Sequence, residues 1–210
     1  MSSSSFLTDP RAKPVVDASV VINLNATLRA ADIIKSLPNP LLVTENACGE
    51  LEGGIGNGHR DYEQLLQLID AGLVQRVRVG AASLSVYESL IDGSTLRTLD
   101  DGEAATIAYA HETAGVALID ERKARTLCAA SFPGLVVAST VDVLIHSSVA
   151  AILGEAGQAD ALASALMTAR MRVPQEHVER VTMIIGAERA ASCASLPKSA
   201  RSNKSTSERV

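Results

Sequence analysis

The sequence contains no tryptophan and few other aromatic residues. Aromatic residues make up 2% of its 210 residues, whereas apolar residues of all kinds make up 47%. A chain of this length can bury a sizeable core, which must be built from Ala, Val, Leu and Ile rather than from rings. This composition favours one domain in which helices pack on a buried sheet.

Long hydrophobic runs are absent as well. The longest apolar stretches, such as GVALI at 115–119 and GLVVAS at 134–139, are far shorter than the roughly 18 residues that a membrane-spanning helix needs. The N-terminal segment lacks the basic start and the apolar run of roughly 7–15 residues that mark a secretory signal. We therefore expect no membrane association and a cytoplasmic location.

Cysteine is scarce. Cys48, Cys128 and Cys193 are odd in number and widely spaced, which argues against a disulfide framework and against a zinc site. The four histidines share no metal-ligand spacing either. These patterns favour a reducing compartment.

The chain is weakly acidic, with 19 Lys and Arg residues against 24 Asp and Glu residues and a formal net charge of −5. Basic residues gather near the C-terminus, so the remaining body is more acidic than the total indicates. An acidic body does not by itself attract nucleic-acid phosphates. A function on RNA or DNA therefore requires another source of positive charge.

Short apolar segments alternate with segments of helical periodicity. Strands are predicted near residues 14–16, 41–43, 73–79, 116–120 and 134–139, with helices between them and after them, such as 100–113 and 140–153. Thr140 stands at the cap position of the helix 140–153. This alternation predicts an α/β fold, a three-layer α/β/α sandwich with a mainly parallel sheet. The strand 73–79 alternates apolar and polar residues and is expected at an edge.

The ends of the chain differ from its middle. Two amphipathic helices without an intervening strand are predicted after residue 157, followed by a tail rich in Ser, Lys and Arg. We predict a flexible N-terminus (1–13), an α/β domain (14–156), a helical extension (157–190) and a disordered basic tail (191–210).

Four acidic residues lie where an open parallel sheet places its active groups. Asp17 and Asp120 each end an apolar run that leads directly into a helix, and Glu50 and Glu103 lie on neighbouring predicted helices. Crowded carboxylates repel one another unless a cation lies between them. Mg²⁺ prefers such oxygen ligands and can support hydrolysis of a phosphodiester. The pattern indicates metal-dependent nuclease chemistry.

These segments carry a resemblance to a known family. VVDASVVINL, the GEL of ENACGELEGG, LDDGEAATIAYA and LIDERKAR resemble the PIN-domain family, and are most similar to its DUF3368-like branch, related to VapC-like nuclease toxins. The similarity runs from about Val15 to Leu144. It departs from the family pattern at Ser139 and Asp142, where family members often have Gly.

The resemblance implies a PIN-like sandwich with extra C-terminal helices, and a Mg²⁺- or Mn²⁺-dependent ribonuclease that acts on RNA. It implies Asp17, Glu50, Glu103 and Asp120 as the catalytic acids, with Asp17, Glu103 and Asp120 as metal ligands. It also places the Thr140 hydroxyl near the metal. Many family members are toxins that a cognate antitoxin protein holds inactive. Ala-rich helices are in addition compatible with a homodimer.

Several assignments stay open. Glu52 rivals Glu50 as the second acid, Asp100 and Asp101 fit a helix start, and Glu121 is undecided between a helix-start residue and a ligand. Arg122 and Lys123 are either solvated helix residues or contacts to substrate phosphates. The segment GGIGNG lacks the context of a phosphate-binding loop and is predicted to be a flexible loop.

Two other functions compete with the nuclease. One is a catalytically inactive binding module of the same fold that engages a protein or nucleic-acid partner. The other, ranked last, is a response-regulator-like phosphoacceptor domain. That class has paired acids after the first strand and a lysine after a late strand, whereas VVDAS offers one acid and GLVVAST offers no lysine.

Overall fold

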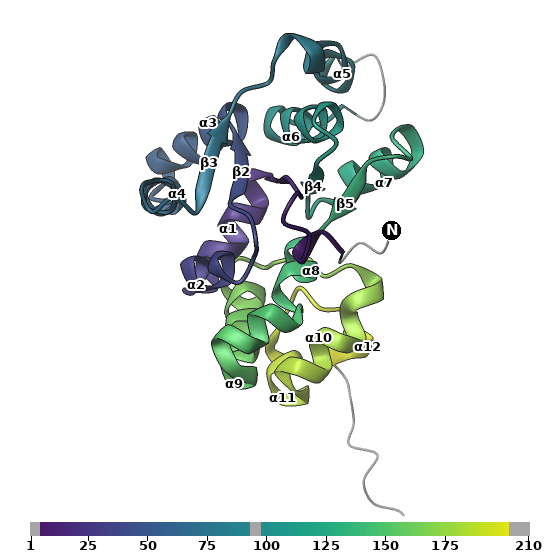
Figure 1. Cartoon of the computed structure of the whole chain (residues 1–210). Coiled ribbons are helices and arrows are strands. Elements are labelled where there is room, and N and C mark those ends of the chain that lie inside the picture. Colours follow the sequence, from purple (N-terminus) through teal and green to yellow (C-terminus); the bar gives the residue numbers. More distant parts are fainter. Residues whose placement is uncertain (1–4, 93–97, 202–210) are drawn as a thin grey trace, which may run out of the picture.

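A five-stranded sheet forms the centre of the molecule (Figure 1). The structure is a computed structural model that describes residues 5–92 and 98–201. The strand order is β3-β2-β1-β4-β5, and all four neighbouring pairs are parallel. The strands are β1 (Pro14–Val16), β2 (Leu41–Thr44), β3 (Val74–Val77), β4 (Val116–Leu118) and β5 (Val136–Ala138). The predicted parallel α/β sandwich is confirmed, and so is the edge position of β3.

The central strands are buried on both faces, which explains their continuous apolar sequence. Val16 stands beside Val43 of β2 and Leu118 of β4, and these side chains belong to one hydrophobic cluster. Val15 and Ala117 point the other way and belong to a second cluster. Alternation along each strand thus supplies both layers of the core.

Helices cover both faces. The first cluster packs the sheet against α1 (Ala18–Ala26), α2 (Ala30–Lys35), α3 (Glu45–Gly53) and α4 (Asp61–Asp70). The second cluster packs it against α6 (Asp101–Glu112) and α7 (Arg122–Ser131), and α5 (Ala81–Ile91) lies on α6. Figure 1 shows these two groups of helices on opposite sides of the strands.

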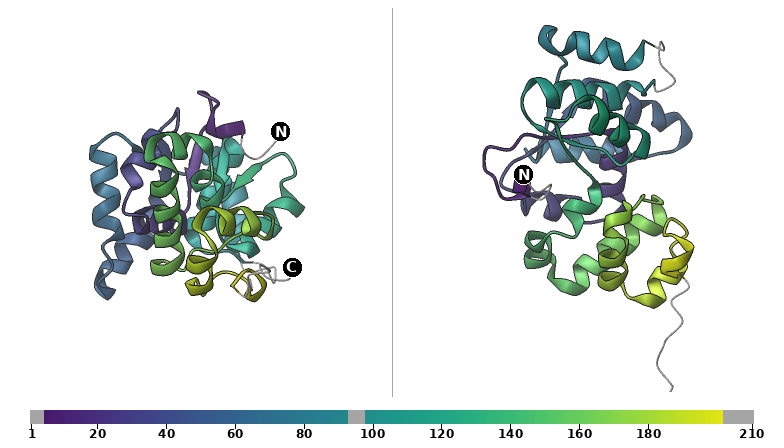
Figure 2. Two further views of the ribbon diagram at one scale, coloured as in Figure 1. Left: turned by 90° about the horizontal axis from the view of Figure 1, so that it is seen from below. Right: turned by 90° about the vertical axis from the view of Figure 1, so that its right-hand side faces the viewer.

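The helices after β5 gather at one end of the molecule, in green and yellow in Figures 1 and 2. They are α8 (Thr140–Leu144), α9 (Ser147–Thr168), α10 (Val178–Ile185), α11 (Ala187–Ser192) and α12 (Lys198–Arg201), and α9 packs on α1 and α2. Gly154, two residues before the predicted domain boundary at residue 156, has non-helical backbone angles and breaks α9 into two helical parts. Among the described residues, no helix is both long and apolar enough to cross a membrane.

The predicted helix 140–153 is wrong in two respects. It consists of two helices, because His146 has extended backbone angles and caps α9. Its N-cap is Ser139 rather than Thr140: Ser139 and Asp142 form a reciprocal capping box at the start of α8. Thr140 is thereby freed for another contact, described below.

The two predicted flexible ends are folded where the structure describes them. Phe6 and Leu7 are buried residues of the 3₁₀ helix η1 (Ser5–Leu7), and Cys193 and Leu196 are buried near the other end. The apolar side chains explain this difference, because each of them fills a gap in the core. Residues 1–4 and 202–210 of these predicted segments lie outside the described residues.

Candidate metal centre

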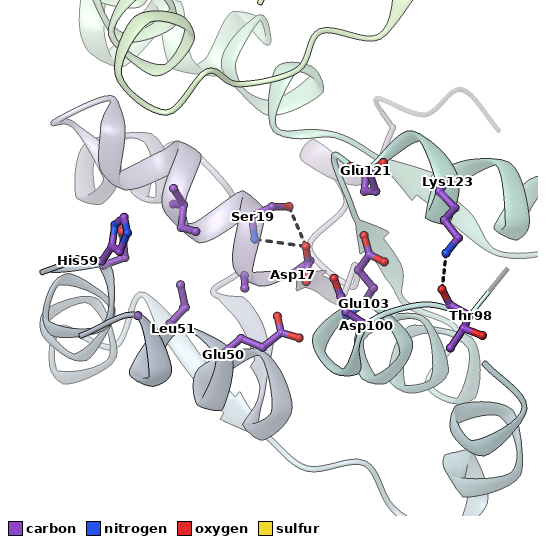
Figure 3. Close-up of a pocket in the computed structure, with 14 residues that line it drawn as sticks. Asp17, Ser19, Glu50, Leu51, His59, Thr98, Asp100, Glu103, Glu121 and Lys123 are labelled. Carbon is purple, nitrogen blue, oxygen red and sulfur yellow. Dashed lines mark hydrogen bonds between the residues drawn. The ribbon is translucent and has the colours of Figure 1, made fainter. Parts of the chain in front are cut away.

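A cavity of about 570 Å³ opens at the carboxyl edge of the sheet. Its acidic lining comes from separate elements: Asp17 follows β1, Glu50 lies on α3, and Asp100 and Glu103 lie at the start of α6. Figure 3 shows these four carboxylates pointing toward a common centre. The cavity thus lies where a parallel sheet collects functional groups.

Asp17 has one oxygen without a hydrogen-bond donor. It is the N-cap of α1, and its Oδ2 accepts hydrogen bonds from the Ser19 amide at 3.3 Å and the Ser19 hydroxyl at 2.7 Å. Its Oδ1 is buried and has no hydrogen-bond partner in the described part of the chain. Burial raises the pKa of Asp17 to about 6. A buried carboxylate oxygen without a donor is costly, and a cation would compensate for it.

Glu50 is held against the start of α6. Its Oε1 accepts a hydrogen bond of 2.7 Å from the amide of Gly102. Burial, with smaller contributions from Asp100 and Asp17, raises the pKa of Glu50 to about 7. Both Glu50 and its rival Glu52 are exposed, but only Glu50 lines the cavity.

Asp100 is the N-cap of α6, as the sequence predicts, and its Oδ1 accepts a hydrogen bond of 2.9 Å from the amide of Glu103. It also belongs to the acidic centre, because one carboxylate oxygen from each of Asp17, Glu50 and Asp100 lies within 4.8 Å of the others. Sequence reasoning missed this second role. A ligand role for Asp100 could be predicted from its place at the N-cap, because an N-cap aspartate uses one carboxylate oxygen for the cap and has a second oxygen for another contact.

Glu103 is 5% exposed and lines the same cavity. Burial raises its pKa to about 8, and the nearby charges of Asp100, Asp17 and Glu121 add to this effect. Asp101, the first residue of α6, instead accepts hydrogen bonds from Tyr87 and Asn46.

Asp120 lies apart from the three grouped carboxylates. Its oxygens accept hydrogen bonds from the Thr140 amide at 2.8 Å, the Thr140 hydroxyl and the Asn23 side chain at 2.6 Å. Burial raises the pKa of Asp120, and these hydrogen bonds oppose the rise. A carboxylate has about four lone-pair positions, so one further contact is available. The metal-ligand role of Asp120 stays a prediction.

Thr140 and Asp142 have distinct tasks at the start of α8. Thr140 donates to Asp120, whereas Asp142 accepts a hydrogen bond from the amide of the N-cap Ser139 and lies 2.9 Å from His177 Nε2. Burial acts to raise the pKa of Asp142, but hydrogen bonds from His177 and Ser139 outweigh burial and lower it. The Asp that departs from the family pattern thus joins α8 to the C-terminal region.

Residues 120–123 form a wall of the cavity. Glu121 and Lys123 line it, and Lys123 donates a hydrogen bond to the carbonyl of Thr98. Asp120 and Arg122 line a different cavity. The two predicted substrate-binding cations, Arg122 and Lys123, therefore lie on different sides of this wall.

The acidic centre fits a hard divalent cation. Its ligand atoms would be carboxylate oxygens, and Asp17 Oδ1 has no hydrogen-bond donor among the described residues. Mg²⁺ and Mn²⁺ take such oxygen ligands, and a cation would relieve the mutual repulsion that contributes to the raised pKa values.

Gly102→Ala should weaken metal binding without unfolding the protein. A Cβ at position 102 would lie 2.5 Å from Glu50 Oε2 and 2.8 Å from its carboxyl carbon, so Glu50 must move. We expect a roughly 10-fold loss of Mn²⁺ affinity by calorimetry. Gly49→Ala is the matched control, because Gly49 is also helical and its Cβ would meet nothing within 4 Å. Equal Mn²⁺ affinity in the two variants would contradict this role of Glu50.

A family model described as a PIN domain, DUF3368, matches residues 13–187. The chain belongs to this PIN-domain family. Comparisons with curated proteins and with solved structures found no match. PIN domains are generally nucleases that use divalent metals, and the acidic centre has the ligands that such chemistry needs.

Proposed function

We propose that this protein is a Mg²⁺- or Mn²⁺-dependent endoribonuclease that hydrolyses phosphodiester bonds of single-stranded RNA. One observation carries the proposal: oxygens of Asp17, Glu50 and Asp100 lie within 4.8 Å of one another, and a buried oxygen of Asp17 has no donor among residues 5–92 and 98–201. The choice of RNA rests on the family resemblance. The same resemblance supports a role as the toxin of a toxin-antitoxin pair.

The residues of the cavity would have different roles in the reaction. Asp17, Glu50 and Asp100 would hold the cation, which supplies positive charge for the phosphate and lowers the pKa of the attacking water. Glu103 lies in the same cavity and has a pKa near working pH, so it is suited to accept the proton that water loses. Asp120 orients Asn23 and Thr140 through its hydrogen bonds, and it has room for one metal contact.

The cation also answers the objection raised by the acidic charge of the chain. Six acidic residues line the cavity, which would repel a phosphate in the absence of metal. A bound divalent cation offsets part of this negative charge and gives the phosphate a positive ligand. Substrate binding should therefore depend on metal.

An inactive binding module is the second candidate. The observation that favours it is that Glu50 and Asp100 each have a structural task, as a partner of the Gly102 amide and as the cap of α6. An acidic centre of this kind could persist for folding alone. Metal binding and cleavage separate the two functions.

The test is calorimetry with Mn²⁺ together with cleavage of end-labelled single-stranded RNA, duplex RNA and single-stranded DNA. We expect Mn²⁺ binding and internal cleavage of the single-stranded RNA, both abolished by EDTA and restored by excess Mn²⁺. Absence of both would favour the binding module. Binding of Mn²⁺ with cleavage of DNA alone would retain the nuclease and overturn the choice of RNA.

A further inference from the structure

A second cavity, of about 730 Å³, lies between α7 and the segment that follows α9. Three arginines line it: Arg122 and Arg125 from α7 and Arg172 from the C-terminal segment. The remaining lining includes the uncharged polar side chains of Thr126, Gln175 and Ser195. The cavity is therefore suited to an anion.

The two cavities share a wall. Along residues 120–123, Asp120 and Arg122 line the second cavity, whereas Glu121 and Lys123 line the acidic one. Arg172 joins the two sides, because its Nη1 lies 2.6 Å from Glu121 Oε2. A nucleic-acid strand bound at the acidic centre would pass over residues 120–123 to reach the arginines of the second cavity.

Arg122 and Arg125 have N–H groups that are available to a ligand. No hydrogen bond or ion pair engages the Arg122 side chain within residues 5–92 and 98–201. Within the part of the chain that the structure describes, the Arg125 side chain makes only long contacts, at 3.5 Å to Glu176 and 3.4 Å to the carbonyl of Ile119. Each guanidinium carries five N–H groups, so these contacts leave most of them unused.

The charges in the cavity favour an anion over a cation. Three guanidinium groups face Glu176 and Asp120, and the oxygens of Asp120 already accept hydrogen bonds. Guanidinium groups match phosphate oxygens in a bidentate manner. Every nucleotide of a nucleic acid carries a backbone phosphate, and this phosphate is the same whatever the base. Arginines can therefore bind it without regard to sequence.

We propose that this arginine-lined cavity binds a backbone phosphate of the nucleic acid adjacent to the phosphate at the acidic centre. The inference rests on the proposed function, and it assigns the C-terminal segment a part in substrate binding through Arg172. Arg122, Arg125 and Arg172 bind the substrate away from the reacting atoms. They should therefore act on affinity and not on the chemical step.

The experiment compares Arg122→Gln and Arg172→Gln with wild type on two substrates: a 12-nucleotide single-stranded RNA and a dinucleotide with one phosphodiester. Each variant should raise KM for the 12-mer by about tenfold, leave kcat unchanged and leave KM for the dinucleotide unchanged. The salt dependence of 12-mer binding should fall by about one in slope for each arginine removed, whatever the RNA sequence. Arg189→Gln is the matched control, since Arg189 is also exposed and pairs with an acid at 2.6 Å, but outside both cavities.

The outcomes separate the inference from the function. If wild type cleaves no nucleic acid, the proposed nuclease fails first. If wild type cleaves and both variants behave like Arg189→Gln, the cavity is not a phosphate site and an acidic protein partner becomes its better occupant. If Arg172→Gln instead changes kcat or Mn²⁺ affinity, or affects the dinucleotide equally, Arg172 acts through Glu121 on the acidic centre and the inference is overturned. Arg172→Lys, which keeps the charge beside Glu121, should restore part of the lost affinity.

Discussion

Asp17→Asn should abolish metal-dependent RNA cleavage while the fold stays intact. Asp17 contributes one of the three convergent oxygens, and its buried Oδ1 has no protein donor within the described residues. Asparagine lacks the negative charge that holds a divalent cation. Removal of a group that fixes the charge in an active site costs roughly 100-fold or more in kcat, so kcat/KM should fall at least to that extent.

The fold should tolerate this change because asparagine is as good an N-cap as aspartate. The amide and hydroxyl of Ser19 can still donate to the side-chain oxygen at position 17. Thermal melting without metal should give a midpoint no lower than that of wild type at pH 7.5, since the variant removes a buried charge. Asp160→Asn, an exposed acid far from the cavity, is the control and should cleave RNA normally. Retention of full activity by Asp17→Asn would exclude the acidic centre as the site of catalysis.

The second large effect is on pH dependence. The folded protein raises the pKa of Asp17 to about 6, of Glu50 to about 7 and of Glu103 to about 8. An unfolded chain releases these protons near pH 4. Between about pH 4 and pH 8 the folded state therefore holds more protons than the unfolded state, and the stability that these groups contribute falls as pH rises.

Metal should counter this loss. A divalent cation binds the ionised carboxylates, so its apparent affinity rises as the protons leave. Of the residues proposed to hold the cation, Glu50 has a pKa of about 7 and Asp17 a pKa of about 6. Each pH unit below the pKa of a ligand costs up to about tenfold in apparent affinity, so Mn²⁺ should bind roughly tenfold more tightly at pH 8 than at pH 6. Melting curves with and without Mn²⁺ should show a gain in midpoint that grows over this range.

Glu103→Gln tests whether the Glu103 carboxyl group causes the fall in stability with rising pH. It removes the group with the highest pKa of the three, so the fall in stability above pH 7 should become shallower. Glu112→Gln, an exposed acid on the same helix, should leave the pH profile unchanged. A profile that is identical in Glu103→Gln and wild type would show that Glu103 does not retain its proton in the folded state.

The candidate site was only partly predictable from sequence. Asp17, Glu50 and Glu103 were selected, and the structure brings all three to one cavity. For Asp100 the sequence predicts a capping role alone, because the local pattern accounts for only one of its two carboxylate oxygens. Asp120 was grouped with the others because it ends a strand, yet its burial against Asn23 and Thr140 depends on contacts across 97 and 20 residues of sequence.

The layers of the sandwich follow from local patterns in the sequence. Continuous apolar strands between amphipathic helices can be buried only as a parallel sheet covered on both faces, and the ends of those strands locate the site. These are local patterns, repeated along the chain, so they can be read without coordinates.

Which carboxylate oxygens come together at the acidic centre depends on the tertiary structure. Whether Glu50 or Glu52 reaches the centre depends on the rotation of α3 against the Gly102 amide, and no local pattern contains that contact. The arginine-lined cavity is likewise formed by α7 and a segment nearly fifty residues later. Long-range packing sets such distances. A side chain that packing holds out of reach of the site cannot contribute a ligand, whatever the sequence around it.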